Sequence, residues 1–335
     1  MTRIGLACGY DSTQGIRDFT EGMRGADERG FEIGFFSETL ALMRDSVTAM
    51  TSFALATTKV KLGCTQIVGL RSPVLMAQTL ATLDELSGGR MILCPGAATR
   101  NHARTHGFAP ADAVQTLREW VEALRLVMSG EKVSYEGQFV KLHDTQMGWR
   151  PLRAHVPLWF AATSATGLRL AGQLGDGVLL NTVSSPEYAA NAIRIVREAV
   201  EGAGRDWSTF EVAALINTSI EDDRDAAIDA VRWEVAYKFL PHKFRTQAGP
   251  RMRVGEPHID PAELPRLEAA HNAGGKRALE KALAKETVAA LTAAGTADEV
   301  KERIQRYRDA GVKLPILRPA ARHQTQRILD LFAQS

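Results

Sequence analysis

The amino-acid sequence predicts a single (β/α)₈ barrel of the TIM type over residues 1–335, on two observations. Short apolar runs with strand character alternate with longer amphipathic stretches along the chain, and the strand-like runs number eight. Alternation of strand and helix is typical of a parallel sheet, and eight repeats fit a sheet closed into a barrel. A doubly wound open sheet is the alternative, because a strand count does not establish closure. The expected strands cover residues 3–8, 31–36, 60–67, 90–94, 157–162, 177–181, 210–219 and 312–317.

Helix start signals stand between these strands. Ser72 is followed by Pro73, which suits the first helical position, and Thr296 precedes Glu299 by three residues in a capping-box pattern. These signals support the helical half of each repeat.

Two segments interrupt the alternation. In residues 131–143 apolar side chains alternate around Gly137, which predicts a small hairpin. Residues 239–284, which precede the eighth strand, are rich in Pro and Gly. Long insertions of this kind are usually lids or binding loops, so we expect a lid-like insertion here. Six basic residues lie in this insertion or just before it: Lys238, His242, Lys243, Arg245, Arg251 and Arg253. They form either a solvent-exposed face or a positive surface that attracts an acidic ligand.

The composition is that of an ordinary globular protein. Apolar residues make up 45% of the chain, and 41 Lys and Arg against 39 Asp and Glu leave a formal charge of +2. This excludes a disordered or collagenous chain and argues against nucleic acid as a partner. No apolar stretch approaches the roughly 18 residues that span a bilayer, so we expect no membrane partner and a cytoplasmic location. Three scattered cysteines do not form a disulfide framework.

The expected strand ends indicate where a site lies, because active sites of such barrels form at the carboxyl ends of the strands. These ends carry small, hydroxyl and amide groups and one carboxylate, Glu38. HExxH and Ser-His-Asp patterns are absent from the sequence, which gives metal hydrolysis and acyl transfer little support. Hydride transfer on a bound organic cofactor needs few ionisable side chains and fits this mouth better.

Residues 161–168 are the most informative stretch. A strand runs into a helix through Thr163, Ser164, Ala165, Thr166 and Gly167. The free N–H groups of a helix start bind anions, and the hydroxyls can add donors to a phosphate. The alternative is that Ser and Thr only cap the helix.

The three cysteines, Cys8, Cys64 and Cys94, all fall at expected strand ends. A three-thiolate metal site is conceivable, but long spacing and the lack of a nearby His favour small buried side chains and no metal. A carboxylate at a strand end faces either the mouth or solvent, which makes Glu38 a candidate for ligand contact.

Several segments together resemble the bacterial luciferase-like family, and within it the branch that uses the deazaflavin coenzyme F420, in particular methylenetetrahydromethanopterin reductase. They are Arg71-Ser-Pro, Leu80-Ala-Thr-Leu-Asp-Glu-Leu-Ser-Gly-Gly-Arg90, Cys94-Pro-Gly, and Leu170-Ala-Gly-Gln-Leu-Gly-Asp-Gly177 followed by Asn181. The likeness covers residues 3–223 and the chain from residue 295 onward.

The resemblance implies a homodimer with a flavin or deazaflavin in the barrel mouth. It implies that the cofactor phosphate lies at residues 163–167, and that a bulge with a non-prolyl cis peptide near Thr65 and Gln66 supports the ring. Cys64 and Thr65 are then candidates for cofactor binding. The resemblance also implies that Cys94, Pro95 and Gly96 lie beneath the cofactor. Glu38, Thr65 and Gln66 are then candidates for orienting ring and substrate, and Cys8, Glu38 and Asn181 for the substrate pocket.

Two departures from the reductase pattern bear on the substrate. Ala7 and Ala97 stand where that enzyme carries acidic residues, which argues against a pterin substrate. The sequence therefore indicates an F420-dependent oxidoreductase acting on an unsaturated or carbonyl-type substrate. An FMN-dependent monooxygenase supplied by a separate flavin reductase is the alternative, and a binding protein that keeps the barrel without turnover is a third possibility.

Overall fold

Eight parallel strands close into a barrel in a computed structural model that describes residues 3–8, 11, 13–38, 43–108, 112–240, 243, 244 and 248–334. The hydrogen-bonded order is β1-β2-β3-β4-β7-β8-β9-β11, and β11 pairs with β1 while β8 pairs with β9. This confirms the predicted barrel, and the open-sheet alternative is wrong. The strands are β1 (Gly5–Ala7), β2 (Ile33–Phe36), β3 (Lys61–Ile67), β4 (Met91–Gly96), β7 (Trp159–Ala162), β8 (Gly177–Leu180), β9 (Glu211–Ile220) and β11 (Leu314–Pro319).

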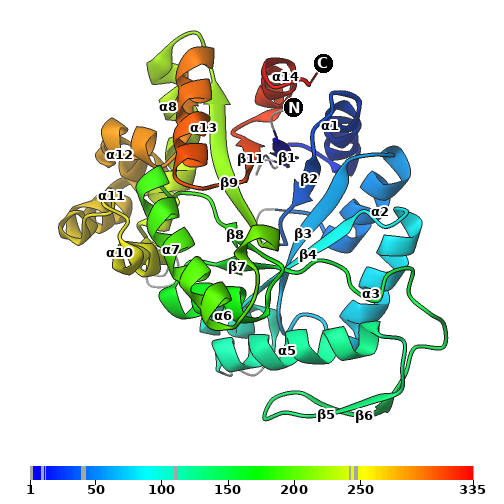
Figure 1. The fold of residues 1–335 in the computed structure, drawn as a ribbon. Coiled ribbons are helices and arrows are strands. Elements are labelled where there is room, and N and C mark those ends of the chain that lie inside the picture. The colour runs from blue at the N-terminus through cyan, green and yellow to red at the C-terminus, as the bar shows by residue number, and fades with distance from the viewer. Residues whose placement is uncertain are drawn as a thin grey trace.

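Helices surround the strands on the outside (Figure 1). Most of these helices begin with a polar side chain that accepts a hydrogen bond from a backbone N–H of the first turn. Ser72 accepts from the Leu75 N–H, and Thr296 accepts from the Glu299 N–H. The surrounding helices are α1 (Ile16–Glu28), α2 (Ser46–Ala56), α3 (Pro73–Leu86), α5 (Ala113–Met128), α6 (Ala165–Leu174), α7 (Pro186–Gly202), α13 (Ala297–Asp309) and α14 (Arg322–Leu331). The short helices α4 (Arg100–His106) and η1 (Trp207–Thr209) lie in connections.

The period-two alternation of the strands separates two hydrophobic cores. Inside the barrel, Ala7, Phe35, Cys94 and Leu215 belong to a cluster made only of strand residues. On the outer face, Leu6, Phe36, Cys64 and Leu93 pack against the helices in a much larger cluster. A strand residue therefore reaches the barrel interior or the helix layer according to its parity.

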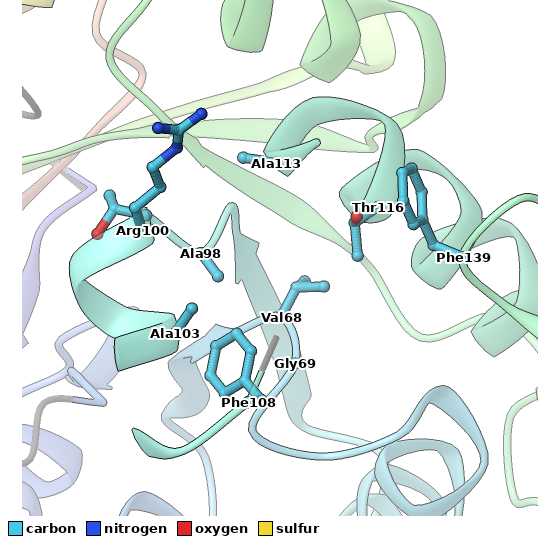
Figure 2. Close-up of a pocket in the computed structure, with 10 residues that line it drawn as sticks. Val68, Gly69, Ala98, Arg100, Ala103, Phe108, Ala113, Thr116 and Phe139 are labelled. Carbon is cyan, nitrogen blue, oxygen red and sulfur yellow. The ribbon is translucent and has the colours of Figure 1, made fainter. Parts of the chain in front are cut away.

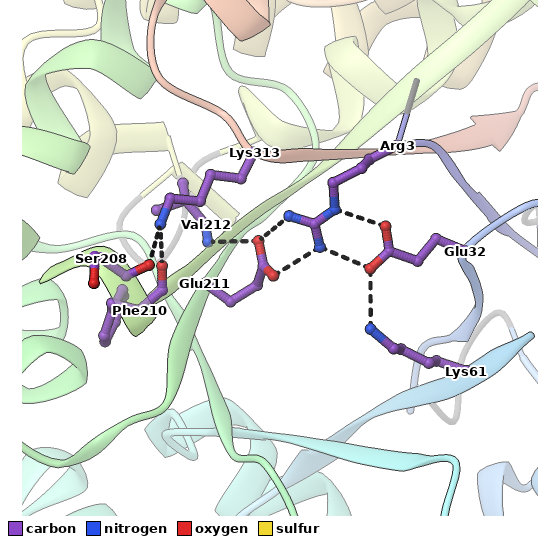
Figure 3. Close-up of polar contacts among 8 residues, drawn as sticks. All are labelled: Arg3, Glu32, Lys61, Ser208, Phe210, Glu211, Val212 and Lys313. Carbon is purple, nitrogen blue, oxygen red and sulfur yellow. Dashed lines mark hydrogen bonds and ion pairs between the residues drawn. The ribbon is translucent and has the colours of Figure 1, made fainter. Parts of the chain in front are cut away.

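Charged side chains close the amino-terminal end of the barrel (Figure 3). Arg3 donates to Glu32 at 2.6 and 2.7 Å and to Glu211 at 2.8 and 3.1 Å, which ties the regions before β2 and β9 together. Lys61 adds a 3.0 Å contact to Glu32, and Lys313 donates to the Phe210 carbonyl at 2.7 Å. Each of these five side chains has a partner of opposite charge or a carbonyl.

A hairpin occupies the first interruption and lies beneath α5 in the view of Figure 1. Its strands are β5 (Val133–Glu136) and β6 (Lys141–Thr145). The buried Glu119 of α5 accepts backbone N–H groups of residues 138, 139 and 140 at 3.0, 2.7 and 3.0 Å. A Cβ at Gly137 would lie 2.4 Å from the Glu119 carboxylate, so only glycine allows this close approach.

The second interruption is largely helical and has its own small core. It comprises α8 (Arg224–Lys238), α10 (Gly249–Val254), η3 (Pro261–Glu263), α11 (Leu264–Ala282), α12 (Lys285–Ala290) and β10 (Ala293–Gly295). Ile228 and Val235 of α8 share a hydrophobic cluster with Leu267, Leu279 and Val288, separate from the barrel core. The inserted unit therefore begins at α8, before residue 239, and α11 is kinked at Gly274 and Gly275. Helices α10, α11 and α12 gather on one side of the barrel, near α7 (Figure 1).

Membrane-spanning helices are not found among the residues that the structure describes.

Candidate active site

The carboxyl ends of the strands form a mouth above the apolar interior. Side chains two residues apart on a strand point to the same face. Three residues of the interior cluster therefore place the residues two positions later on the inner side of the mouth: Gly96 after Cys94, Asn181 after Leu179 and Asn217 after Leu215. The same parity places Thr65 there. The mouth is thus lined by amide, hydroxyl and glycine positions, with few charges.

Glu38, Thr65 and Gln66 are brought together, as the sequence predicted. The Glu38 N–H donates to Thr65 Oγ1 at 2.8 Å, and Gln66 Nε2 donates to the Glu38 carboxylate at 3.2 Å. Ser46, at the start of α2, donates to the same carboxylate oxygen and accepts from Gln66 Nε2 at 2.6 Å. Sequence reasoning missed Ser46, because its link to Glu38 depends on how α2 docks against β2 and β3.

The prediction of a bulge near Thr65 and Gln66 is wrong. β3 pairs with β4 without a shift of register from Leu62 opposite Met91 to Ile67 opposite Gly96. Within the described ranges every peptide bond is trans. The segment is regular because β4 continues the ladder past Cys64, where the pairing with β2 ends, so its side chains keep strict alternation.

The cysteines separate according to parity. Cys94 lies inside the barrel, whereas Cys8 and Cys64 belong to the outer core, and all three thiols are free and buried. Burial raises the pKa of each thiol, to about 12 for Cys64, where the Glu38 charge adds to the effect. Clusters of three or more metal-ligating side chains are absent from the described part of the chain.

The start of α6, where an anion site was expected, is capped by Ser164. Ser164 Oγ accepts from the Gly167 N–H at 3.2 Å, and the Leu168 N–H bonds the Ser164 carbonyl. The cap thus uses one hydroxyl, while the N–H groups of Ala165 and Thr166 lie in the first turn, which has no helical acceptor for them. Thr163 precedes the cap, and its carbonyl accepts from the buried Tyr188 hydroxyl at 3.2 Å.

A pocket of about 300 Å³ lies beside the ends of β3 and β4 (Figure 2). Its wall is mostly apolar, and in Figure 2 the Arg100 guanidinium extends away from Val68 and Phe108. The side chains that line it come from separate segments of the chain, so the sequence alone does not bring them together. The lining residues are Val68, Gly69, Ala98, Thr99, Arg100, Ala103, Phe108, Ala113, Thr116 and Phe139.

The inserted unit contacts the mouth on the side of β8, β9 and β11. Arg318, which is 2% exposed, donates to Asn217 Oδ1 at 3.0 Å and forms an ion pair with Glu234 of α8. Glu256 accepts from the Ser185 N–H at 2.7 Å. Asn217 and Arg318 were missed, although the alternation Ala213, Leu215, Asn217 was a usable signal. His242 and Arg245 lie outside the described residues.

A family model described as luciferase-like monooxygenase matches residues 1–314. Among curated proteins, the 5,10-methylenetetrahydromethanopterin reductase of Archaeoglobus fulgidus is 30% identical over 294 residues, covering 86% of this chain and 85% of the relative. The F420-dependent glucose-6-phosphate dehydrogenase of Nakamurella multipartita is 26% identical and covers 92% and 88%.

Among solved structures, the coenzyme F420-dependent tetrahydromethanopterin reductase of Methanopyrus kandleri superposes with a TM-score of 0.86 over 99% of this chain and 97% of that one, at 23% identity. The match extends over the whole barrel and the inserted unit. The chain therefore belongs to the luciferase-like monooxygenase family, whose members share this barrel, and it is an oxidoreductase of that family.

Proposed function

We propose that this protein transfers a hydride between coenzyme F420 and a small organic substrate of unsaturated or carbonyl type. The observation that carries the proposal is the combination of a nearly neutral mouth with a helix start that presents unpaired N–H groups and hydroxyls. The similarity to an F420-dependent dehydrogenase and to methylenetetrahydromethanopterin reductases supports F420 as the cofactor.

The donor set fits a deazaflavin with a phosphodiester. The α6 start offers N–H donors and the hydroxyls of Thr163, Ser164 and Thr166 to a phosphate. Next to it, Gly96 pairs with Ala161, and a Cβ at Gly96 would make an ordinary van der Waals contact with the Ala161 Cβ at 3.6 Å, so this floor consists of small side chains. A flat ring needs such a surface. The deazaflavin itself supplies hydride transfer at C5, which requires no ionisable side chain.

The chain's own residues bind and orient under this proposal. The segment from Thr163 to Gly167 binds the phosphate, and Cys94, Pro95 and Gly96 with Thr65 shape the surface under the ring. Cys64, expected at the cofactor, lies in the outer core and acts only through packing. Glu38, Thr65 and Gln66 fix the geometry of the β2 and β3 ends through their hydrogen bonds. Asn181 lines the substrate side. Cys8 lies in the outer core, so it acts on the pocket only through packing.

Small side chains at two positions bear on the substrate. Ala7 is buried in the barrel interior and Ala97 follows β4 at the mouth. Neither can donate or accept a hydrogen bond through its side chain. A substrate with a small polar surface suits this side of the mouth better than a pterin.

Titration of the purified protein with F420 and with FMN, followed by quenching of cofactor fluorescence, tests the proposal. Tight binding of F420 and weak binding of FMN is the expected result. Selective FMN binding with oxygen consumption driven by reduced flavin would instead establish the monooxygenase alternative. Binding without turnover across a panel of ketones, secondary alcohols and enones would favour a binding protein.

We also propose a homodimer, and a separate F420 or flavin reductase that supplies reduced cofactor. Exposed leucines on neighbouring helices support the dimer: Leu55 at the end of α2 is 71% exposed, and Leu75 and Leu86 at α3 are 49% and 41% exposed. Exposed large apolar side chains are common at protein interfaces.

A further inference from the structure

We propose that the inserted unit builds an oxyanion-binding subsite at the barrel mouth, with Arg251 of α10 and Lys238 of α8 as its cationic groups. The proposal deepens the proposed function and rests on it for the cofactor and the reaction. The ligand chemistry is a phosphate or carboxylate, carried either by the cofactor or by the substrate.

Arg251 is the central observation. It is 1% exposed, and its Nη2 donates to the Thr182 carbonyl at 2.9 Å. Nε and Nη1 are buried and have no hydrogen-bond partner among the residues that the structure describes. An unpaired buried N–H is costly, and a guanidinium that only held the Thr182 carbonyl would not need burial of its other donors. Nε and one Nη present the paired donors that match an oxyanion.

Lys238 lies close to Arg251. Burial, together with the positive charges of Arg251 and Lys243, lowers the pKa of Lys238 to about 7. Among the described residues no carboxylate forms an ion pair with Lys238 or Arg251. The positive charge of Arg251 thus acts on Lys238, and an anion bound by Arg251 would offset this repulsion and favour the protonated Lys238.

The acidic group in this region is already engaged. The buried Glu256 accepts N–H groups of Ser185 at 2.7 Å and His258 at 3.3 Å, and it acts on Arg251 only through its field. Burial raises the pKa of Glu256, against the effect of these hydrogen bonds. The carboxylate therefore holds the insertion on the start of α7 and leaves the donors of Arg251 free.

The position connects the subsite to the mouth. Thr182 follows β8, and α10 packs against both α6 and α7. Tyr188 lies near Arg251 and donates to the carbonyl of Thr163, the first residue of the expected phosphate segment. An anion held by Arg251 would thus lie on the side of the mouth that the α6 start also faces.

The test uses the full-length protein without cofactor and inorganic phosphate as the probe. Calorimetric titration and thermal denaturation are run with about 10 mM phosphate against chloride at equal ionic strength. We expect phosphate to bind and raise Tm, Arg251→Met to weaken binding at least about tenfold, and Arg251→Lys to keep part of it. The matched control is Arg253→Met, an exposed arginine on the same helix, which should bind as the unaltered protein does.

Equal phosphate affinity in the unaltered protein and in Arg251→Met would overturn the proposal, as would absence of phosphate binding. If phosphate bound only at the α6 start, its affinity would be equal in the two proteins, and this would also count against the subsite. Folding is not the obstacle, because replacing an unpaired buried charge by an apolar side chain is often neutral or stabilising.

F420 titrations with and without phosphate identify the source of the anion. Competition, with weaker F420 binding in Arg251→Met, assigns the subsite to the cofactor. Unchanged F420 affinity, with phosphate binding to the F420 complex, assigns it to the substrate. Since the phosphate measurements need no F420, failure of F420 to bind would refute the proposed function and leave the subsite result standing.

Discussion

Replacing Gly167 separates cofactor binding from helix stability. A Cβ at this position would lie 3.3 Å from the Ala162 Cβ and 3.4 Å from Ser164 Oγ, so the cap and the end of β7 must shift by a few tenths of an ångström. Alanine favours the helix by about 1 kcal/mol over glycine, which offsets the crowding. Gly167→Ala should therefore fold with nearly unchanged stability, and Gly167→Val, with two more methyl groups, should crowd the cap further.

The effect on binding follows from the donors at the α6 start. Displacing one charge-assisted N–H to phosphate contact costs about 1.5–3 kcal/mol, or roughly 10- to 150-fold in Kd. We expect F420 affinity, measured by fluorescence quenching, to fall by at least about tenfold in Gly167→Val and less in Gly167→Ala. The control is Arg169→Val, an exposed position on the same helix. Unchanged F420 affinity in a folded Gly167→Val protein would refute the placement of the phosphate.

Three further predictions concern catalysis, acid stability and assembly. Glu38→Ala should lower the steady-state rate sharply, and Cys8→Ser and Cys94→Ser only modestly; loss of activity in either serine variant with F420 still bound would reverse these roles. Burial alone would raise the pKa of Glu32, but hydrogen bonds from Arg3 and Lys61 lower it. The stabilisation by Glu32 is therefore complete above its unfolded value of 4.5 and is lost as the pH falls below it. Arg3→Met should lower the free energy of unfolding by about 1–2 kcal/mol at neutral pH, and urea titrations near pH 3 should show a smaller difference. Leu55→Glu should shift a dimer toward monomer in light scattering, whereas a monomeric unaltered protein would refute the dimer.

Much of the barrel could be predicted because its signals are local. Each of the eight expected strands overlaps an observed one, since buried parallel strands read as short apolar runs bounded by turn residues. β10 was missed because three residues, Ala293–Gly295, are too short to show a period. The helical content of the insertion was missed because its prolines, as Pro250 and Pro261 show, stand in the first turn of helical segments, where proline is tolerated.

The site was less predictable, because side-chain direction and docking decide it. Proximity of Glu38 to Gln66 followed from adjacent strand ends, but the third member, Ser46, comes from a helix whose docking the sequence does not encode locally. Cys8, Cys64 and Cys94 were all expected at strand ends, but Cys64 and Cys94 lie within β3 and β4, and only Cys94 lies inside the barrel. A shift of one residue in an expected strand end is enough to exchange these faces.

The two ends of the barrel treat buried arginines differently, and this contrast bears on function. Arg3, at the amino-terminal end, donates hydrogen bonds to Glu32 and Glu211. These bonds raise the pKa of Arg3 above its usual range despite partial burial. Arg251, at the mouth, is more deeply buried, and two of its donors have no partner in the described part of the chain, while burial lowers its pKa. The donors of Arg3 are matched by carboxylates, whereas those two donors of Arg251 are not. The unsatisfied donors lie at the end where barrels of this kind bind their ligands, so a bound anion is the partner that completes them.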